Sequence, residues 1–287
     1  MKFFPLVIVA LLLLVSCTKD PDEALSASKA HDLPNIAYGT HAQQKFDMYL
    51  PAGRSASKTK VFIFIHGGAW VGGDKSDFSS GIPHLKQTYF PKYAVVNMNY
   101  VLANVFGNPR ALPNQINDIQ AVIDFITAKS EEWQVKPEFV LCGHSAGAHL
   151  SMYYAYTKNN PNVKAVVSLA GPSDFDDPAY TSNAILGIVF SGLVDPAIIP
   201  SGMTINQFAS PVTWIKSGST PTIAFFGSTD TGVPVNDQKA RLENKLQQYN
   251  VPHEIHIWNG DHNAFALEPQ LSDNAKKIKA FLAIYNP

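Results

Sequence analysis

The sequence predicts an α/β fold with a mostly parallel, doubly wound sheet. Short apolar runs such as Val61–Ile65 and Val163–Leu169 are typical of strands that are buried on both faces. Between such runs lie segments with helical periodicity, and the clearest spans residues 112–133. Strands that alternate with helices of this length favour a parallel sheet with helices on both faces. The chain has 287 residues, of which 46% are hydrophobic and 16% are charged, so it has enough apolar side chains for a large core.

The N-terminal segment has the pattern of an export signal. One lysine is followed by an apolar run of roughly a dozen residues, which is shorter than the ~20 needed to span a bilayer. Residues 1–16 are therefore predicted to be a signal peptide. Leu14–Cys17 resembles the bacterial lipobox, in which cleavage leaves a lipid-modified cysteine at the new N-terminus. This resemblance implies a protein exported to the cell envelope and tethered to a membrane through acyl chains on Cys17.

The remainder of the chain is predicted to form a short tether and one catalytic domain. Residues 17–33 are polar and aperiodic, as expected of a flexible spacer, and the domain covers residues 34–287. Two alternating segments, 36–39 and 44–50, are predicted to form antiparallel strands at the edge of the sheet. Residues 171–219 interrupt the regular alternation and are interpreted as a small cap insertion.

The other predicted elements follow in chain order. Strands are expected at residues 94–99, 138–142, 222–226 and 254–258, and helices at residues 148–155, 235–249 and 273–285. Gly143–Gly147, with the sequence Gly-His-Ser-Ala-Gly, falls between a predicted strand and a predicted helix. This context indicates a nucleophile elbow, in which Ser145 occupies a strained turn and the two flanking glycines avoid a steric clash.

A serine hydroxyl needs a general base to become a nucleophile at neutral pH. His262 and Asp230 each follow a predicted strand, so both are expected at the carboxyl edge of the sheet with Ser145. In this arrangement His262 accepts the serine proton and Asp230 orients the imidazole. Asp174, which follows the preceding strand, is a rival for the acid role.

Backbone N–H groups near Ser145 are candidates for an oxyanion hole. Gly67 and Gly68 follow the central strand and have no side chains to cover their N–H groups. Ala146 is the residue after the nucleophile, and its N–H completes the predicted hole. Trp70 lies beside this loop and is a candidate for contact with substrate.

His66–Trp70 together with Gly143–Gly147 resembles the motifs of the hormone-sensitive-lipase-like esterases of the α/β-hydrolase superfamily. Gly143–Leu150 is similar to the feruloyl and acetyl esterases that act on carbohydrate, and to the kynurenine formamidases. The resemblance covers residues 36–287 and implies an α/β-hydrolase fold, a carboxylic ester hydrolase and no cofactor. Combined with export, it favours short acyl or aromatic acyl esters of carbohydrate as substrates.

Other functional classes are weakly supported by the sequence. A net charge of −1 provides no basic excess for nucleic acid. Residues 68–76 approach a phosphate-binding loop, but Asp74 separates the glycine from the lysine. The histidines lack the spacing of a metal site, so no metal is expected. Two alternatives stay open, namely an amide hydrolase such as an arylformamidase or serine peptidase, and a non-catalytic binding protein on the same fold.

Overall fold

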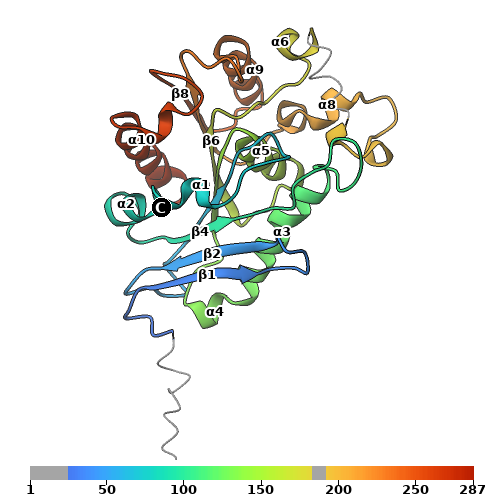
Figure 1. The fold of residues 1–287 in the computed structure, drawn as a ribbon. Coiled ribbons are helices and arrows are strands. Elements are labelled where there is room, and N and C mark those ends of the chain that lie inside the picture. The colour runs from blue at the N-terminus through green and yellow to red at the C-terminus, as the bar shows by residue number, and fades with distance from the viewer. Residues whose placement is uncertain (1–24, 183–191) are drawn as a thin grey trace, which may run out of the picture.

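The computed structural model describes residues 25–182 and 192–287. A twisted sheet runs through its centre and helices cover both faces (Figure 1). This arrangement confirms the predicted doubly wound α/β architecture. The strands are β1 (His31–Ala37), β2 (Lys45–Leu50), β3 (Val61–Ile65), β4 (Ala94–Met98), β5 (Phe139–His144), β6 (Val163–Leu169), β7 (Thr222–Gly227) and β8 (His253–Trp258).

The strand order in the sheet is β1-β2-β4-β3-β5-β6-β7-β8. β1 pairs with β2 and β2 with β4 in antiparallel fashion, whereas all later pairs are parallel. The predicted antiparallel edge at the N-terminal end is therefore confirmed. The parallel strands bring their carboxyl ends to one edge, where loops from distant parts of the chain meet.

The helices outside residues 171–219 are α1 (Ser76–Ser79), α2 (Ile82–Thr88), α3 (Asn114–Ala128), α4 (Ser130–Trp133), α5 (Ala146–Lys158), α9 (Val235–Gln248) and α10 (Gln270–Tyr285). All of them lie between strands except α10, which follows the last strand, β8. Sequence periodicity located α3, α5, α9 and α10 but missed the short α1 and α2, which have no sustained apolar stripe. The predicted helix at 112–133 divides at Lys129, whose ψ of 4° departs from helical geometry.

The central strand β3 contributes to both layers of the core. Val61, Ile63 and Ile65 pack on the face covered by α3 and α5, while Phe62 and Phe64 pack on the face covered by α10. All five side chains are buried. This explains why β3 reads as a continuous apolar run rather than as an alternating one.

The predicted cap insertion, residues 171–219, consists of short helical pieces where the structure describes it. A capping box, in which the side chains of Thr204 and Gln207 accept hydrogen bonds from each other's backbone N–H groups, begins α8 (Ile205–Ala209). Residues 183–191 lie outside the described residues. The pieces are α6 (Pro178–Thr181), η1 (Pro196–Ile198), α8 (Ile205–Ala209) and η2 (Pro211–Trp214).

The prediction that residues 17–33 form a flexible spacer is wrong for the last residues of that range. β1 begins at His31, which pairs with Leu50. The buried Arg54 guanidinium donates hydrogen bonds to the carbonyls of residues 25, 26 and 29, and these contacts fix the segment before β1. These contacts could not be predicted from the sequence, because backbone carbonyls, not apolar side chains, make them.

The predicted signal peptide, residues 1–16, and the predicted lipidation site Cys17 lie outside the described residues. Among the residues that are described, no helix has the length and apolar composition needed to cross a bilayer.

Candidate active site

Ser145 lies in a strained turn between β5 and α5. Its backbone has φ 53° and ψ −117°, in the left-handed half of conformational space that favours glycine. The turn is held by the Ser145 N–H, which donates to the Leu169 carbonyl of β6 at 2.8 Å, and by the Ser145 carbonyl, which accepts from His149 N–H at 3.0 Å. The structure thus has the nucleophile-elbow geometry that the motif predicted.

The two glycines of the motif are required by close backbone contacts. A Cβ on Gly143 would lie 2.1 Å from the carbonyl carbon of Gly147, and a Cβ on Gly147 would lie 2.0 Å from the carbonyl oxygen of Ile65. Both separations are far below van der Waals contact. Glycine at these two positions therefore allows α5 to pack directly on β5 and β3.

His262 is paired with Asp230. The His262 Nδ1–H donates to Asp230 Oδ2 at 2.6 Å, and the Asp230 side chain is fully buried while 26% of the His262 side chain is exposed. Asp230 Oδ1 accepts two further hydrogen bonds from the N–H groups of Gly232 and Val233. Burial by itself would raise the Asp230 pKa, but the hydrogen bonds from His262 and the two N–H groups outweigh it and the pKa is lowered.

The rival acid is engaged elsewhere. Asp174 Oδ2 forms an ion pair with Arg241 at 2.7 Å, and Asp174 Oδ1 accepts from the N–H of Asp176. The structure therefore places Asp230, and not Asp174, against the imidazole of His262.

His144, the residue before Ser145 in the elbow, contacts His262. The two imidazole rings pack with centroids 4.7 Å apart, and His144 Nε2–H donates to the His262 carbonyl at 3.1 Å. Because Ser145 is the next residue, this contact holds the His262 loop beside the nucleophile. Within residues 25–182 and 192–287 no hydrogen bond joins Ser145 Oγ to His262. Such contacts are often long in unliganded enzymes and shorten when substrate binds.

His144 is kept neutral by its surroundings. Burial is the main cause that lowers its pKa to about 4, and positive charge on His262 lowers it further. The hydrogen bond to the His262 carbonyl and the charge of Asp230 act in the opposite direction. A neutral His144 packs against His262 without opposing the positive charge that a general base acquires.

The loop after β3 lies against the elbow. A Cβ on Gly67 would lie 3.2 Å from the Ser145 Cβ, so the Gly67 backbone is close to the nucleophile. Gly68 has φ +107°, which favours glycine, and its carbonyl accepts from Val71 and Gly72 N–H groups. In the part of the chain that the structure describes, neither Gly67 N–H nor Gly68 N–H donates to a protein group. Ala146 N–H belongs to the first turn of α5, where intrahelical partners are lacking.

Two buried side chains brace this loop. His66 Nδ1–H donates to the Gly67 carbonyl at 2.7 Å, and the Tyr100 hydroxyl donates to the carbonyls of His66 and Gly67 at 3.0 and 3.2 Å. The His66 and Tyr100 rings are stacked with centroids 4.2 Å apart. Because the carbonyls are held on one side, the N–H groups of the loop are left for a ligand.

Trp70 forms part of a buried wall beside the elbow. Its indole N–H donates to His149 Nδ1 at 3.0 Å, and its ring packs edge-on against His149 and Phe175. Only 6% of the residue is exposed. Contact between Trp70 and substrate stays a prediction, whereas the structure shows the residue as a link between the Gly67–Gly68 loop and α5.

Sequence reasoning missed three contributors to the site, namely His144, Tyr100 and Phe265. The sequence analysis assigns no role in the site to His144, although its position inside the elbow motif was a usable signal. Phe265 packs on His144 with ring centroids 4.5 Å apart. Neither Tyr100 nor Phe265 belongs to a motif, and only the folded chain reveals them. No cluster of three potential metal ligands occurs among the described residues.

Comparison with known families identifies the chain. Residues 46–246 match the model of the BD-FAE family, which spans the region from β2 into α9 and includes Ser145 and Asp230. The chain belongs to the BD-FAE family. The match ends before His262, which the structure nevertheless pairs with Asp230.

Relatives of this BD-FAE protein include named enzymes. Over 221 residues it is 24% identical to the esterase LipC of Mycobacterium tuberculosis, which covers 72% of this chain and 53% of the relative. It is 28% identical over 152 residues to a kynurenine formamidase of Salmo salar, covering 50% of this chain and 47% of the relative. The chain thus spans about half the length of the curated relatives it matches.

Solved structures with the same fold include a truncated form of a carbohydrate esterase from gut microbiota. That structure superposes with a TM-score of 0.72 at 18% identity and covers 90% of this chain and 98% of its own. Esterase B from Lactobacillus rhamnosis gives a TM-score of 0.71 at 18% identity over 92% and 91% of the two chains. At this level of identity the likeness establishes the α/β-hydrolase fold.

Proposed function

We propose that this BD-FAE protein is a serine carboxylic ester hydrolase that works through an acyl-enzyme intermediate. One observation carries the proposal: His262, held by the buried Asp230 at 2.6 Å, is packed beside the elbow that presents Ser145. A buried carboxylate that orients an imidazole next to a strained serine is the arrangement required for nucleophilic acyl transfer.

In the proposed acylation step, Ser145 Oγ attacks the ester carbonyl carbon while His262 Nε2 accepts the hydroxyl proton. Asp230 accepts a hydrogen bond from His262 Nδ1–H, which leaves Nε2 free to act as the base. The Asp230 carboxylate also stabilises the imidazolium that forms. The negative charge that develops on the carbonyl oxygen is stabilised by the N–H groups of Gly67, Gly68 and Ala146. When the intermediate collapses, the C–O bond to the alcohol breaks and His262 returns the proton to the leaving alkoxide.

Deacylation repeats the sequence with water in place of Ser145. His262 takes a proton from water, and the resulting hydroxide attacks the acyl carbon and forms a second oxyanion at the same N–H groups. The bond from the acyl carbon to Ser145 Oγ then breaks, His262 returns its proton to the serine, and the carboxylic acid leaves. The cycle consumes one water and needs no cofactor.

For the substrate, we propose short acyl or aromatic acyl esters of carbohydrate. The support is the carbohydrate esterase among the structural neighbours, together with a bifunctional GH43-CE protein of Bacteroides eggerthii that superposes with a TM-score of 0.71 at 23% identity. Predicted export supports the same class, because polymeric carbohydrate is met outside the cytoplasm.

Amide hydrolysis is the second candidate, because kynurenine formamidases are among the relatives. A panel of p-nitrophenyl acetate, acetylated xylan, feruloylated xylan and N-formylkynurenine distinguishes the two. We expect the highest kcat/KM on the carbohydrate esters. A higher kcat/KM on N-formylkynurenine would show that the protein is an amide hydrolase.

Ser145→Ala should lower kcat by about 10⁴ or more on any true substrate. Equal rates for the variant and the parent would remove the acyl-enzyme mechanism, and no hydrolysis of any substrate would favour a binding protein.

We also propose that Cys17 carries the lipid that attaches the protein to the bacterial envelope. The lipobox-like residues Leu14–Cys17 support this assignment. In a host that processes lipoproteins, the parent chain should sediment with membranes, and Cys17→Ala should be released with its specific activity intact. A Cys17→Ala variant that still sediments with membranes would contradict the lipid anchor.

A further inference from the structure

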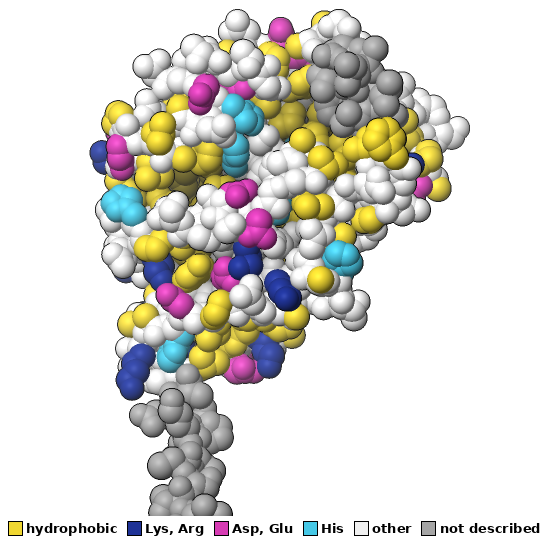
Figure 2. All heavy atoms as spheres, viewed as in Figure 1, with side chains coloured by type: hydrophobic (Ala, Val, Ile, Leu, Met, Phe, Trp, Pro, Cys, Tyr) yellow, Lys and Arg dark blue, Asp and Glu magenta, His cyan; other side chains and the backbone are white. Residues whose placement is uncertain are grey.

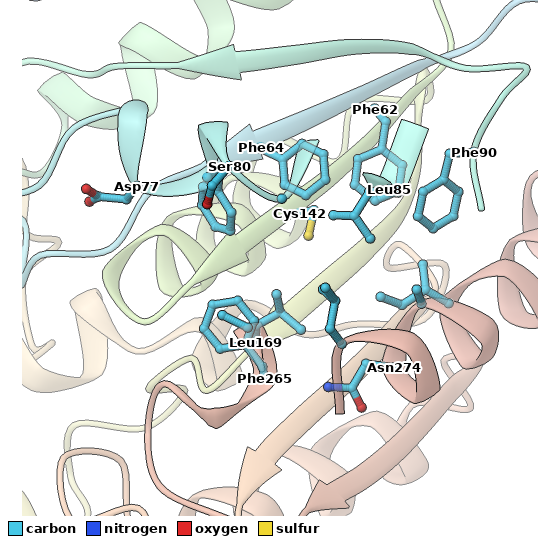
Figure 3. Close-up of a pocket in the computed structure, with 16 residues that line it drawn as sticks. Phe62, Phe64, Asp77, Ser80, Leu85, Phe90, Cys142, Leu169, Phe265 and Asn274 are labelled. Carbon is cyan, nitrogen blue, oxygen red and sulfur yellow. The ribbon is translucent and has the colours of Figure 1, made fainter. Parts of the chain in front are cut away.

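An apolar cavity of about 100 Å³ lies between the sheet and the helices α1, α2 and α10 (Figure 3). It is on the Phe62 and Phe64 face of β3, which is the face opposite to α5. Figure 2 shows a hollow with a hydrophobic lining on this part of the surface. A cavity of roughly 150 Å³ with apolar walls holds one benzene ring. The space here is smaller but open to the surface, so a ligand with a single aromatic ring fits with part of the molecule at the opening.

The walls of the cavity come from distant parts of the chain. Phe64, Cys142 and Leu169 stand near the carboxyl ends of three neighbouring strands, and Phe265 comes from the loop that carries His262 (Figure 3). Most of the lining is aliphatic or aromatic. Burial raises the pKa of the Cys142 thiol, so this group stays protonated and acts as part of the apolar wall.

One polar group in the wall lacks a partner. Asn274 on α10 is 6% exposed, and its Nδ2 makes no hydrogen bond with any residue that the structure describes. A buried amide without a partner is costly, and such groups point to a missing ligand or water. A ligand hydroxyl both donates and accepts hydrogen bonds, so it satisfies the Asn274 amide in either orientation.

The charge of the lining selects against anions. Asp77 stands at the cavity, and no lysine, arginine or histidine lines it. A carboxylate ligand would meet Asp77 without a compensating cation, whereas a neutral molecule would not. We therefore propose that this cavity is a binding site for a small neutral hydroxyl compound, of the size of phenol, whose oxygen bonds Asn274 and whose ring contacts Phe64 and Phe265.

This site is separate from the proposed catalytic centre, but one of its lining residues contacts His144, which packs on the catalytic imidazole. Phe265 faces the cavity and also packs on His144, and His144 packs in turn on His262. Two aromatic layers thus lie between the ligand and the catalytic imidazole. Binding does not depend on ester hydrolysis, so the proposal stands or fails independently of the proposed function.

Calorimetric titration of the full chain with phenol and with toluene tests the site. Both probes are similar in size, but only phenol has a hydroxyl. Ala275, a buried residue of α10, lines the cavity, and Ala275→Leu fills it. We expect this variant to weaken phenol binding by about tenfold or more, because the leucine occupies the space of the ring. Ala280→Leu places the same side chain on an exposed position of the same helix and should bind phenol like the parent.

Asn274→Leu separates the hydroxyl contact from the apolar contact. The ratio of phenol affinity to toluene affinity should be at least about fivefold higher for the parent than for Asn274→Leu, because one hydrogen bond is worth about 1 kcal/mol and the variant leaves the buried hydroxyl without a partner. This variant keeps the number of side-chain heavy atoms and their branching at Cγ, so it provides the test if Ala275→Leu does not fold. Absence of phenol binding to the parent, or unchanged phenol binding by Ala275→Leu, would overturn the proposal. Loss of phenol binding in Ser145→Ala would also overturn it, because the probe would then occupy the catalytic centre.

Discussion

Protonation of His149 should destabilise the protein as the pH falls. The buried His149 ring accepts the Trp70 indole N–H at Nδ1 and donates Nε2–H to the Ala209 carbonyl at 2.8 Å. The neutral ring therefore satisfies both contacts. A second ring proton would face the N–H of Trp70, and the new charge would have no water around it. Burial, partly opposed by the Ala209 hydrogen bond, lowers the His149 pKa from 6.5 to about 4.

The magnitude follows from the difference between the folded and unfolded pKa values. Because the folded pKa is the lower of the two, the unfolded chain binds the proton first as the pH falls. Stability is therefore present above pH 6.5 and is lost progressively between 6.5 and about 4. Between about pH 7 and about pH 5, this linkage removes about 2 kcal/mol from the free energy of unfolding.

Urea unfolding at the two pH values measures the effect. His149→Gln supplies an amide that accepts from Trp70 and donates to Ala209 but does not titrate. The parent should lose about 2 kcal/mol more than His149→Gln between the two pH values. His84→Gln, at an exposed position of α2, should retain the pH dependence of the parent. Equal losses for the parent and His149→Gln would refute the reasoning.

Three other substitutions test the active-site geometry. Asp230→Asn should lower kcat by about 10⁴, because the amide that replaces the carboxylate no longer selects the Nε2-basic tautomer of His262. Asp174→Asn, which removes only the ion pair with Arg241, should change kcat by less than about tenfold. If Asp174→Asn lowered the rate of ester hydrolysis more than Asp230→Asn, Asp174 and not Asp230 would be the catalytic acid. Gly147→Ala should prevent α5 from seating on β3, because its Cβ would lie 2.0 Å from the Ile65 carbonyl oxygen. An unchanged Tm for Gly147→Ala would show that the elbow has room for the methyl group.

Most of the parallel sheet was predictable because its strands are buried on both faces. β6 has the bounds that its apolar run predicts, and β7 and β8 differ by one residue at one end. Segments stabilised mainly by backbone or polar contacts were not predictable in this way. β1 begins five residues earlier than expected at His31, and Arg54, which is remote from it in the sequence, holds the chain before it.

The candidate site also has some residues that local sequence patterns predict and others that only the fold identifies. The elbow motif and the position of His262 after a strand are local features, so the sequence alone indicated them. The choice between Asp230 and Asp174 was not local, since both follow strands that end at the same edge of the sheet. The fold resolves it by distance, with Asp230 at 2.6 Å from His262 and Asp174 paired to Arg241.

The sequence by itself determined the fold class and the chemistry that its motifs permit, because apolar periodicity and glycine spacing act over a few residues. Tertiary structure alone decided which carboxylate meets His262, how His144 and Tyr100 support the site, and that Asn274 faces an apolar cavity. The physical reason is that hydrogen bonds, ring packing and burial act between atoms a few ångströms apart, whatever the separation of their residues along the chain.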